Sequence, residues 1–226
     1  MAFTQKTLEF LAENRMRNSR EWFHAHRADY QAHVMQPLAA LSEALAPTAE
    51  RIDSQVVTGA KVNKTLSRIY RDTRFSKDKT LYREHMWVVF MRDKHLFTDP
   101  PALVFEFWPD GYYYGCGYYH IPTRVMAALR ELVLADDPAY LAAQRALDKH
   151  PEFALDGECY RRAHYPDQPE KKRAWLERRN LSVLHGSPDV TEIYGDGLAQ
   201  RVADGFAAIA PVYRLMLAAA ELAKRD

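Results

Sequence analysis

The fold class of this chain is decided by residues 87–119, which read WVVFMRDKHLFTDPPALVFEFWPDGYYYGCGYY. Three segments of this stretch, 87–91, 102–108 and 112–119, are rich in β-branched and aromatic residues, which favour strands. Turn sequences separate them, Asp99-Pro100-Pro101 before the second and Pro109-Asp110-Gly111 before the third. The stretch therefore predicts an antiparallel meander of three strands.

Helical patterns lie on the N-terminal side of this stretch. Thr4 or Thr7 caps a first short helix, and Asn18 or Ser19 caps a second whose aromatic and aliphatic residues recur at helical spacing. The second pattern is interrupted at Pro37, and leucines then continue it to the proline at 47. We therefore expect helices up to residue 46.

The C-terminal side mixes helices with short strands. Helices are predicted at 123–134, after Asp137-Pro138, at about 170–178, and at 198–224, where Pro211 divides the pattern. Residues 153–155 and 159–161 predict a hairpin joined through Asp156-Gly157, and 181–184 a further strand.

These elements predict one α+β domain, an antiparallel sheet packed against several helices, over residues 1–226. Its parts are N-terminal helices at 4–46, a strand-rich centre at 67–120 and a mixed helical C-terminal part at 122–226. The strands cluster in sequence and do not alternate with helices, which argues against a doubly wound parallel sheet. Residues 67–72 are an additional candidate strand, although Lys64, Arg68 and Arg71 also fit one face of a helix.

Composition is that of an ordinary globular protein. The 226 residues are 47% hydrophobic, enough for one sizeable core, and a pI of about 7.8 argues against a general nucleic-acid coat protein. The N-terminus lacks a signal-peptide core, no apolar run is long enough to span a bilayer, and two cysteines form no disulfide framework. We therefore expect a cytoplasmic protein with no membrane partner.

Residues 61–83 concentrate positive charge that the rest of the chain lacks. Eight lysines and arginines stand against only Asp72 and Asp78, a local net charge of +6 in a chain whose total is +1. Arginine forks bind phosphate or carboxylate oxygens two at a time, lysines add mobile charges and hydroxyls donate hydrogen bonds. The candidate ligand-binding residues are Arg68, Arg71, Arg74, Ser76, Lys77 and Lys79.

The same segment resembles a known family. The phrase from Arg68 to Thr80, RIYRDTRFSKDKT, with Tyr82 just beyond it, is similar to the signature of a widespread bacterial family of conserved hypothetical proteins, domain of unknown function 2461. Residues 10–11, 18–23, 109–111 and 115–117 resemble further parts of its pattern, so the resemblance spans most of the chain. It implies one α+β domain of bacterial cytoplasmic origin and no established activity.

The chain departs from that pattern at three positions. Leu81 stands where the family usually has proline, and Asn14 and Arg17 replace a leucine and an asparagine. None of these changes removes a charged group of the basic segment.

Two interpretations of the basic segment remain open. In the first, Asp72 and Asp78 orient the arginines around a bound anion, or one of them acts as a base or metal ligand. In the second, arginines and aspartates at short spacing form an ion-pair network that holds the loop to the domain.

Other patterns favour structural roles. Tyr112, Tyr114, Cys116 and Tyr118 share one face of a strand, which indicates core packing more than a stacking platform and makes Cys116 a buried thiol. The nine histidines have no chelating spacing, so we expect no metal site, and no cofactor-binding motif is present. A second basic cluster at 170–179 fits a solvated helix face.

The sequence thus predicts a protein that binds an anionic, phosphate-bearing ligand, a small molecule or a nucleic acid, through residues 61–83. Phosphate-ester hydrolysis or transfer is the natural reaction class if binding leads to chemistry. The alternatives are a nucleic-acid or protein interaction module that uses the basic face and the tyrosines, and a purely structural ion-pair segment. The oligomeric state does not follow from the sequence.

Overall fold

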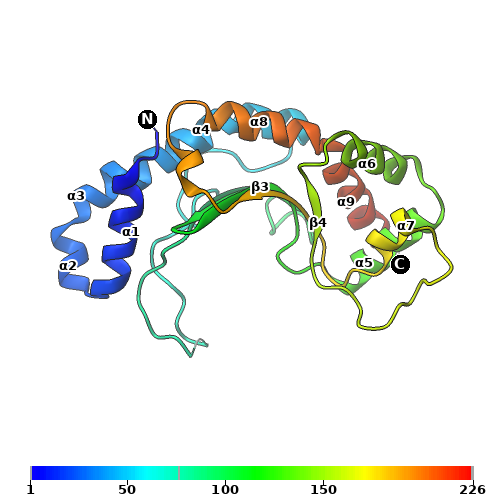
Figure 1. Cartoon of the computed structure of the whole chain (residues 1–226), viewed down its shortest axis with the longest axis horizontal. Helices are drawn as coiled ribbons and strands as arrows, with labels where there is room; N and C mark the ends of the chain where they lie inside the picture. The colour runs from blue at the N-terminus through cyan, green and yellow to red at the C-terminus, as the bar shows by residue number, and fades with distance from the viewer. Residues whose placement is uncertain (1, 76, 225–226) are drawn as a thin grey trace.

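The computed structural model describes residues 2–75 and 77–224. A curved antiparallel sheet lies at the centre, with helices across its convex face and at both ends (Figure 1). The predicted α+β class is therefore confirmed, and both the sheet and the helices share one core.

The first helices lie at one end of the sheet (Figure 1): α1 (Gln5–Arg17), α2 (Arg20–Ala25), α3 (Arg27–Tyr30) and the π-helical turn η1 (Gln31–Met35). The next helix, α4 (Gln36–Ile52), runs across the convex side beside α8 (Leu198–Ala208). The Thr7 hydroxyl accepts a hydrogen bond from the Thr4 N–H and donates one of 2.7 Å to the His33 carbonyl. Pro37 lacks the N–H that would bond this carbonyl in a regular α-helix, so the Thr7 contact replaces that bond and docks α1 on the turn.

Five strands form the sheet in the order β1-β2-β3-β5-β4, all pairs antiparallel. Their bounds are β1 Met86–Met91, β2 Ala102–Trp108, β3 Gly111–Gly117, β4 Ala154–Asp156 and β5 Ser182–Ser187. The first three form the predicted meander. The predicted strand at 181–184 is β5, and it pairs with β3 on one side and β4 on the other.

The remaining helices cover the convex face and the far end of the sheet. They are α5 (Thr123–Leu134), α6 (Pro138–Lys149), α7 (Glu170–Leu176), the 3-10 turn η2 (Val190–Ile193), α8 (Leu198–Ala208) and α9 (Ala210–Leu222). In the described part of the chain no single helix is long and apolar enough to cross a membrane. The helices α8 and α9 together have the length and composition of a membrane span, but they are bent by 53° and many of their residues are buried in the core.

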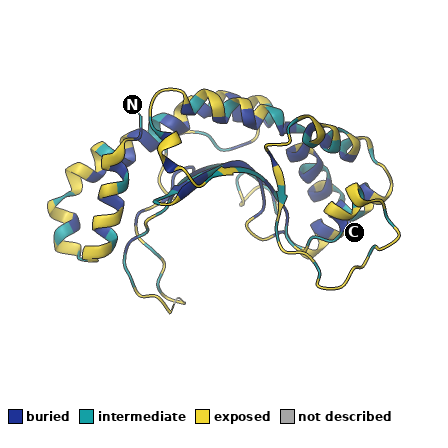
Figure 2. Cartoon of the chain, in the orientation of Figure 1, coloured by how far each residue is buried: buried dark blue, intermediate teal, exposed yellow. Residues whose placement is uncertain are grey.

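The two faces of the sheet differ in burial, because buried and partly buried residues alternate along β1 and β2. Figure 2 shows buried and intermediate residues mixed along the strands. On the convex face α4 contacts β1, and α8 and α9 contact β3. Alternate residues of the strands are buried on this side, for example Phe105, Phe107 and Tyr112. On the concave face the residues between them, such as Val104 and Glu106, are only partly buried. We call this concave side of β1, β2, β3 and β5 the open face.

The glycines of β3 bring β5 close. A Cβ at Gly115 would lie 2.0 Å from the Val183 carbonyl oxygen, so only glycine allows the two strands to pair here.

Three predicted elements are wrong. The helix expected to end at Pro47 continues through it to Ile52. Residues 67–72 form one isolated bridge, at Tyr70, in place of a strand, and a second bridge lies just before them at Leu66. The segment 153–155 pairs with β5 and not with 159–161, because β5 supplies a buried partner for Leu155, while Cys159 bridges to Arg178.

Candidate functional site

The basic segment is a long hairpin attached to the edge of β1. The Ser67 N–H donates to the Trp87 carbonyl at 3.0 Å, and the Val89 N–H donates to the Thr65 carbonyl at 2.9 Å. Further out, two bonds of 2.8 Å join 69–71 to 81–83, Arg71 N–H to the Leu81 carbonyl and Arg83 N–H to the Ile69 carbonyl. Residues 72–80 are therefore the loop that this hairpin closes. Figure 1 shows it projecting from the sheet on the side of the N-terminal helices.

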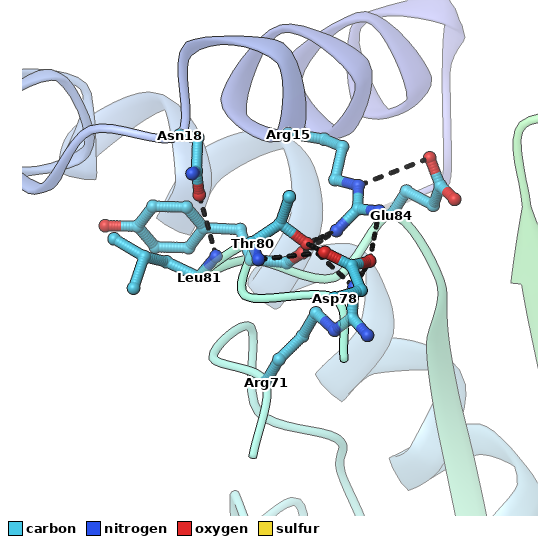
Figure 3. Close-up of polar contacts among 8 residues, drawn as sticks. Arg15, Asn18, Arg71, Asp78, Thr80, Leu81 and Glu84 are labelled. Carbon is cyan, nitrogen blue, oxygen red and sulfur yellow. Dashed lines mark hydrogen bonds and ion pairs between the residues drawn. The ribbon is translucent and has the colours of Figure 1, made fainter. Parts of the chain in front are cut away.

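A polar network holds one side of this loop to α1 (Figure 3). The Asp78 carboxylate accepts from Arg15 at 2.9 Å and also from Arg71, and the Thr80 hydroxyl accepts from Arg71 at 2.7 Å. The Leu81 N–H donates to the Asn18 side chain at 2.7 Å. The Thr80 backbone N–H, followed by Arg15 and Arg71, holds the pKa of Asp78 well below its usual value.

Asp72 and Arg74 form a second pair within the loop. The Arg74 guanidinium donates to both Asp72 oxygens, at 3.0 and 2.7 Å, and these bonds hold the pKa of that carboxylate well below its usual value. Lys79 donates to the Thr73 carbonyl at 2.8 Å. Both aspartates named as candidate bases or metal ligands are therefore bound to arginine.

The six candidate ligand-binding residues do not converge on one point. Arg71 turns toward α1, whereas Arg74 and Lys79 bond within the loop. Arg68 and Lys77 are exposed, and neither forms an ion pair within 2–75 or 77–224. Ser76 lies outside the described residues. The network thus favours the structural interpretation for Asp72, Asp78 and Arg74, and it leaves Arg68 available.

Arg83 is a functional candidate that the sequence reasoning did not single out. Its guanidinium lies 4.6 Å from the Trp87 ring, and its Nε donates to the Tyr70 carbonyl at 3.3 Å. Burial, followed by the positive charges of Arg68 and Arg71, lowers the pKa of Arg83. Among the described residues no carboxylate lies within ion-pairing distance of Arg83 or Arg68. We call Arg68, Arg71 and Arg83 the arginine cluster.

A polar group lies on the open face beside this cluster. Cross-strand pairing places Glu106 of β2 between Trp87 of β1 and Tyr113 of β3. His85 precedes β1, and its Nδ1 lies 2.5 Å from Glu106 Oε1, while the Tyr113 hydroxyl donates to Glu106 Oε2. The Glu106 side chain is 16% exposed, so both of its oxygens are used in a largely dehydrated position.

One sequence signal could have identified this group. Glu106 is the single charged residue in the run Ala102–Trp108, at a position that alternates with buried Phe105 and Phe107. A carboxylate at such a position needs a hydrogen-bonding partner. The partners come from other strands, and their identity depends on the register.

The tyrosines and cysteine predicted to pack in the core do so. Tyr112, Tyr114 and Tyr118 are 1%, 4% and 8% exposed, and burial raises the pKa of the fully buried Cys116 thiol. They therefore do not form a stacking platform. The exposed aromatic groups of the sheet are on the open face, where the rings of Trp108 and Tyr113 lie 5.6 Å apart.

The second basic cluster is remote from the first. Figure 1 shows α7 at the opposite end of the molecule from the loop 72–80. Lys171 pairs with Asp148 and Lys172 with Asp136, each at 2.7 Å, as expected for a solvated helix face. Within the described ranges no three His, Cys, Asp or Glu side chains gather as metal ligands.

Comparison with known proteins identifies one match. A family model with the description conserved hypothetical protein (DUF2461) matches residues 6–214. A comparison with curated proteins finds no significant match.

Proposed function

The chain belongs to this family of conserved hypothetical proteins, whose description names no activity, and from its geometry we propose that it binds a phosphate-bearing ligand at the arginine cluster. The proposal keeps the bacterial, cytoplasmic setting expected from the sequence. Of the six predicted ligand-binding residues it keeps Arg68 and Arg71, and it adds Arg83.

The excess of positive charge at the cluster supports the proposal. The charges of Arg68 and Arg71 both act on Arg83, and within the described residues Arg71 is the member of the cluster that forms an ion pair with a carboxylate, Asp78. Like charges held close together raise the free energy of the unliganded protein, and an anion that binds there removes this repulsion. Guanidinium groups suit phosphate because they donate two parallel hydrogen bonds.

The open face favours nucleic acid as a second candidate ligand. Trp87, Trp108 and Tyr113 are partly exposed there, and Arg83 stacks on Trp87. Aromatic rings beside arginines bind the bases and phosphates of single strands, as single-stranded nucleic-acid binders do. The shared chemistry is a phosphate group, and its source is either a small molecule or a polynucleotide.

Thermal unfolding with and without ligand tests the proposal. Inorganic phosphate, mononucleotides, sugar phosphates and short oligonucleotides are each added to wild type at low and moderate salt. A ligand that binds only the folded protein raises Tm, and a concentration of 100 times Kd adds about 2.7 kcal/mol of stability. We expect Arg68→Ala to abolish this rise while its own Tm without ligand stays that of wild type, because Arg68 is exposed and outside the ion pairs of the loop.

Two further variants sharpen the test. Arg161→Ala removes an exposed arginine from the far end and is expected to leave binding unchanged. Arg74→Ala tests whether the basic segment outside the arginine cluster contributes to binding. We expect this variant to bind as wild type does, because Arg74 is already bound to Asp72. If wild type gains no stability from any of these ligands, the proposed function is wrong.

Salt distinguishes the two ligand sources. Binding to a polynucleotide releases counterions, and its affinity falls steeply as salt rises, by about 0.7 log units per phosphate contact for each tenfold change in salt on single strands. A mononucleotide or sugar phosphate that binds as well as the oligomer would identify a small-molecule site.

A further inference from the structure

The hydrogen bonds of Glu106 determine which ring nitrogen of His85 carries the proton. Burial, followed by the neighbouring Glu106, raises the pKa of Tyr113, so its hydroxyl stays protonated and donates to Glu106 Oε2. The Glu106 carboxylate also lies near enough to Arg83 to stabilise its positive charge. A carboxylate accepts hydrogen bonds, so Nδ1 of His85 is the donor to Oε1. A neutral His85 then carries its lone pair on Nε2.

His85 and the arginine cluster meet at one aromatic ring. The His85 ring centroid lies 5.3 Å from that of Trp87, and the Arg83 guanidinium lies 4.6 Å from the same ring. The His85 side chain is 40% exposed, whereas Glu106 behind it is 16% exposed. An imidazole with its lone pair on Nε2, oriented by a less exposed carboxylate, therefore lies beside the guanidinium of Arg83, which forms no ion pair within the described residues.

We propose that His85 is the general base of a phosphate-ester hydrolase and that Glu106 is its positioning residue. The inference rests on the proposed function, since the ester is the ligand held by the arginine cluster. It assigns acid–base chemistry to a residue pair outside the basic segment, and it needs neither Asp72 nor Asp78.

The reaction uses water as the second substrate. His85 Nε2 removes a proton from a water molecule while the water oxygen forms a bond to phosphorus. The bond between phosphorus and the ester oxygen breaks, and the leaving alkoxide takes up a proton from the imidazolium or from solvent. Arg83 and Arg68 stabilise the negative charge on the non-bridging oxygens in the transition state. The products are the free alcohol and a phosphate with one ester group fewer.

Hydrolysis of bis(4-nitrophenyl) phosphate and of 4-nitrophenyl phosphate tests this reaction between pH 5 and 9. Positioned general bases contribute about 10²- to 10⁴-fold to rate, so we expect His85→Ala to lower kcat by about 10²-fold or more. It should also remove the fall in rate at acid pH, since that fall reports protonation of the base. We expect Glu106→Gln to lower kcat by about 10-fold with little change in KM, because the ester does not contact this residue.

The chain contains a matched control in a second histidine–glutamate pair. His150 Nδ1 lies 3.1 Å from Glu152 Oε1, and neither residue neighbours the arginine cluster. His150→Ala should retain wild-type kcat and pH profile. Tyr113→Phe provides a second test of positioning if Glu106→Gln does not fold, since it removes only the hydrogen bond to Oε2.

Thermal shifts with inorganic phosphate separate the two proposals. If wild type binds phosphate but hydrolyses neither ester, the inference is wrong and the proposed function stands. The same holds if wild type binds phosphate and His85→Ala hydrolyses the esters as fast as wild type does. Wild type that binds no phosphate and hydrolyses no ester overturns both.

Discussion

Asn14 is a polar residue in a fully buried position. It lies on the inner side of α1 with Phe10 and Leu11 and is 0% exposed. Neither its amide nitrogen nor its carbonyl oxygen has a hydrogen-bonding partner among residues 2–75 and 77–224. Each buried, unpaired polar group has a substantial desolvation cost. The resemblance noted in the sequence implies leucine here, which has a similar volume and no polar atoms.

We therefore expect Asn14→Leu to stabilise the protein. The gain in free energy of unfolding should be about 1–3 kcal/mol, the cost of burying an unpaired polar group. Urea denaturation of wild type and variant measures it directly. A lower unfolding midpoint in the variant would contradict this account.

The neighbouring Asn18 is the matched control. Its side chain accepts from the Leu81 N–H, and its backbone has the left-handed conformation that ends α1, with φ of 46°. Asn18→Leu loses both features and should be less stable than wild type. The two asparagines thus have opposite expected effects, although they lie four residues apart.

At the level of elements, the loop 72–80 depends on α1 for its position. Arg15 is the α1 residue that contacts Asp78 and Thr80, and it also donates to the Tyr82 carbonyl at 3.2 Å. The loop carries the exposed side chains of Arg74, Phe75 and Lys77. Its shape near Asp78 therefore reflects a contact between segments 63 residues apart in the chain.

We expect Arg15→Ala to release this loop. Trypsin should cleave after Lys77 or Lys79 faster than in wild type, and the Leu81 amide, which donates to Asn18, should exchange its hydrogen faster. Arg17→Ala is the control, because Arg17 pairs only with Glu13 of its own helix in the described structure. Equal cleavage rates for the two variants would show that Arg15 does not hold the loop.

Acid should have the same effect as the Arg15 substitution. Because its contacts lower the pKa of Asp78, the carboxylate favours the docked loop above its ordinary pKa of 3.8, and this contribution is lost as pH falls further. Hydrogen exchange at Leu81, corrected for its intrinsic pH dependence, should therefore accelerate below about pH 4 in wild type and change less in Arg15→Ala.

At the scale of the whole molecule, Asp53 joins three parts of the fold. It follows α4, accepts from Arg92 just beyond β1 at 2.7 Å, and accepts from the Tyr213 hydroxyl of α9 at 3.0 Å. Its side chain is 3% exposed. Burial acts to raise the pKa of Asp53, but the bonds from Arg92, the Gln55 N–H and Tyr213 together lower it.

We expect Arg92→Ala to destabilise the whole domain. The substitution leaves a buried carboxylate without its ionic partner, which costs about 3 kcal/mol or more. Urea unfolding should show one cooperative transition at lower denaturant. Arg124→Ala is the control, because the Arg124–Asp99 pair lies at the surface and contributes about 0–1 kcal/mol. Similar losses of unfolding free energy in the two variants would show that the Asp53–Arg92 pair does not hold the parts of the fold together.

The sequence by itself determined the elements that local interactions specify. The three strands of the meander, the caps at Ser19 and Asp137 and the start of α6 at Pro138 follow from side chains within a few residues, and the structure confirms each of them. The α+β class also followed from the sequence, because strands that are consecutive in the chain and joined by short turns pair antiparallel. Residue type and spacing also located the positive charge in 61–83.

Only the tertiary structure decided which partners those residues have. β5 enters the sheet between β3 and β4, which no local pattern indicates, and Asp78 meets Arg15 from another helix. Glu106 meets His85 and Tyr113 because strand register places them together, 21 and 7 residues away in the chain. The energy of a charged side chain depends on the charges and solvent around it, and folding brings those neighbours from distant parts of the sequence.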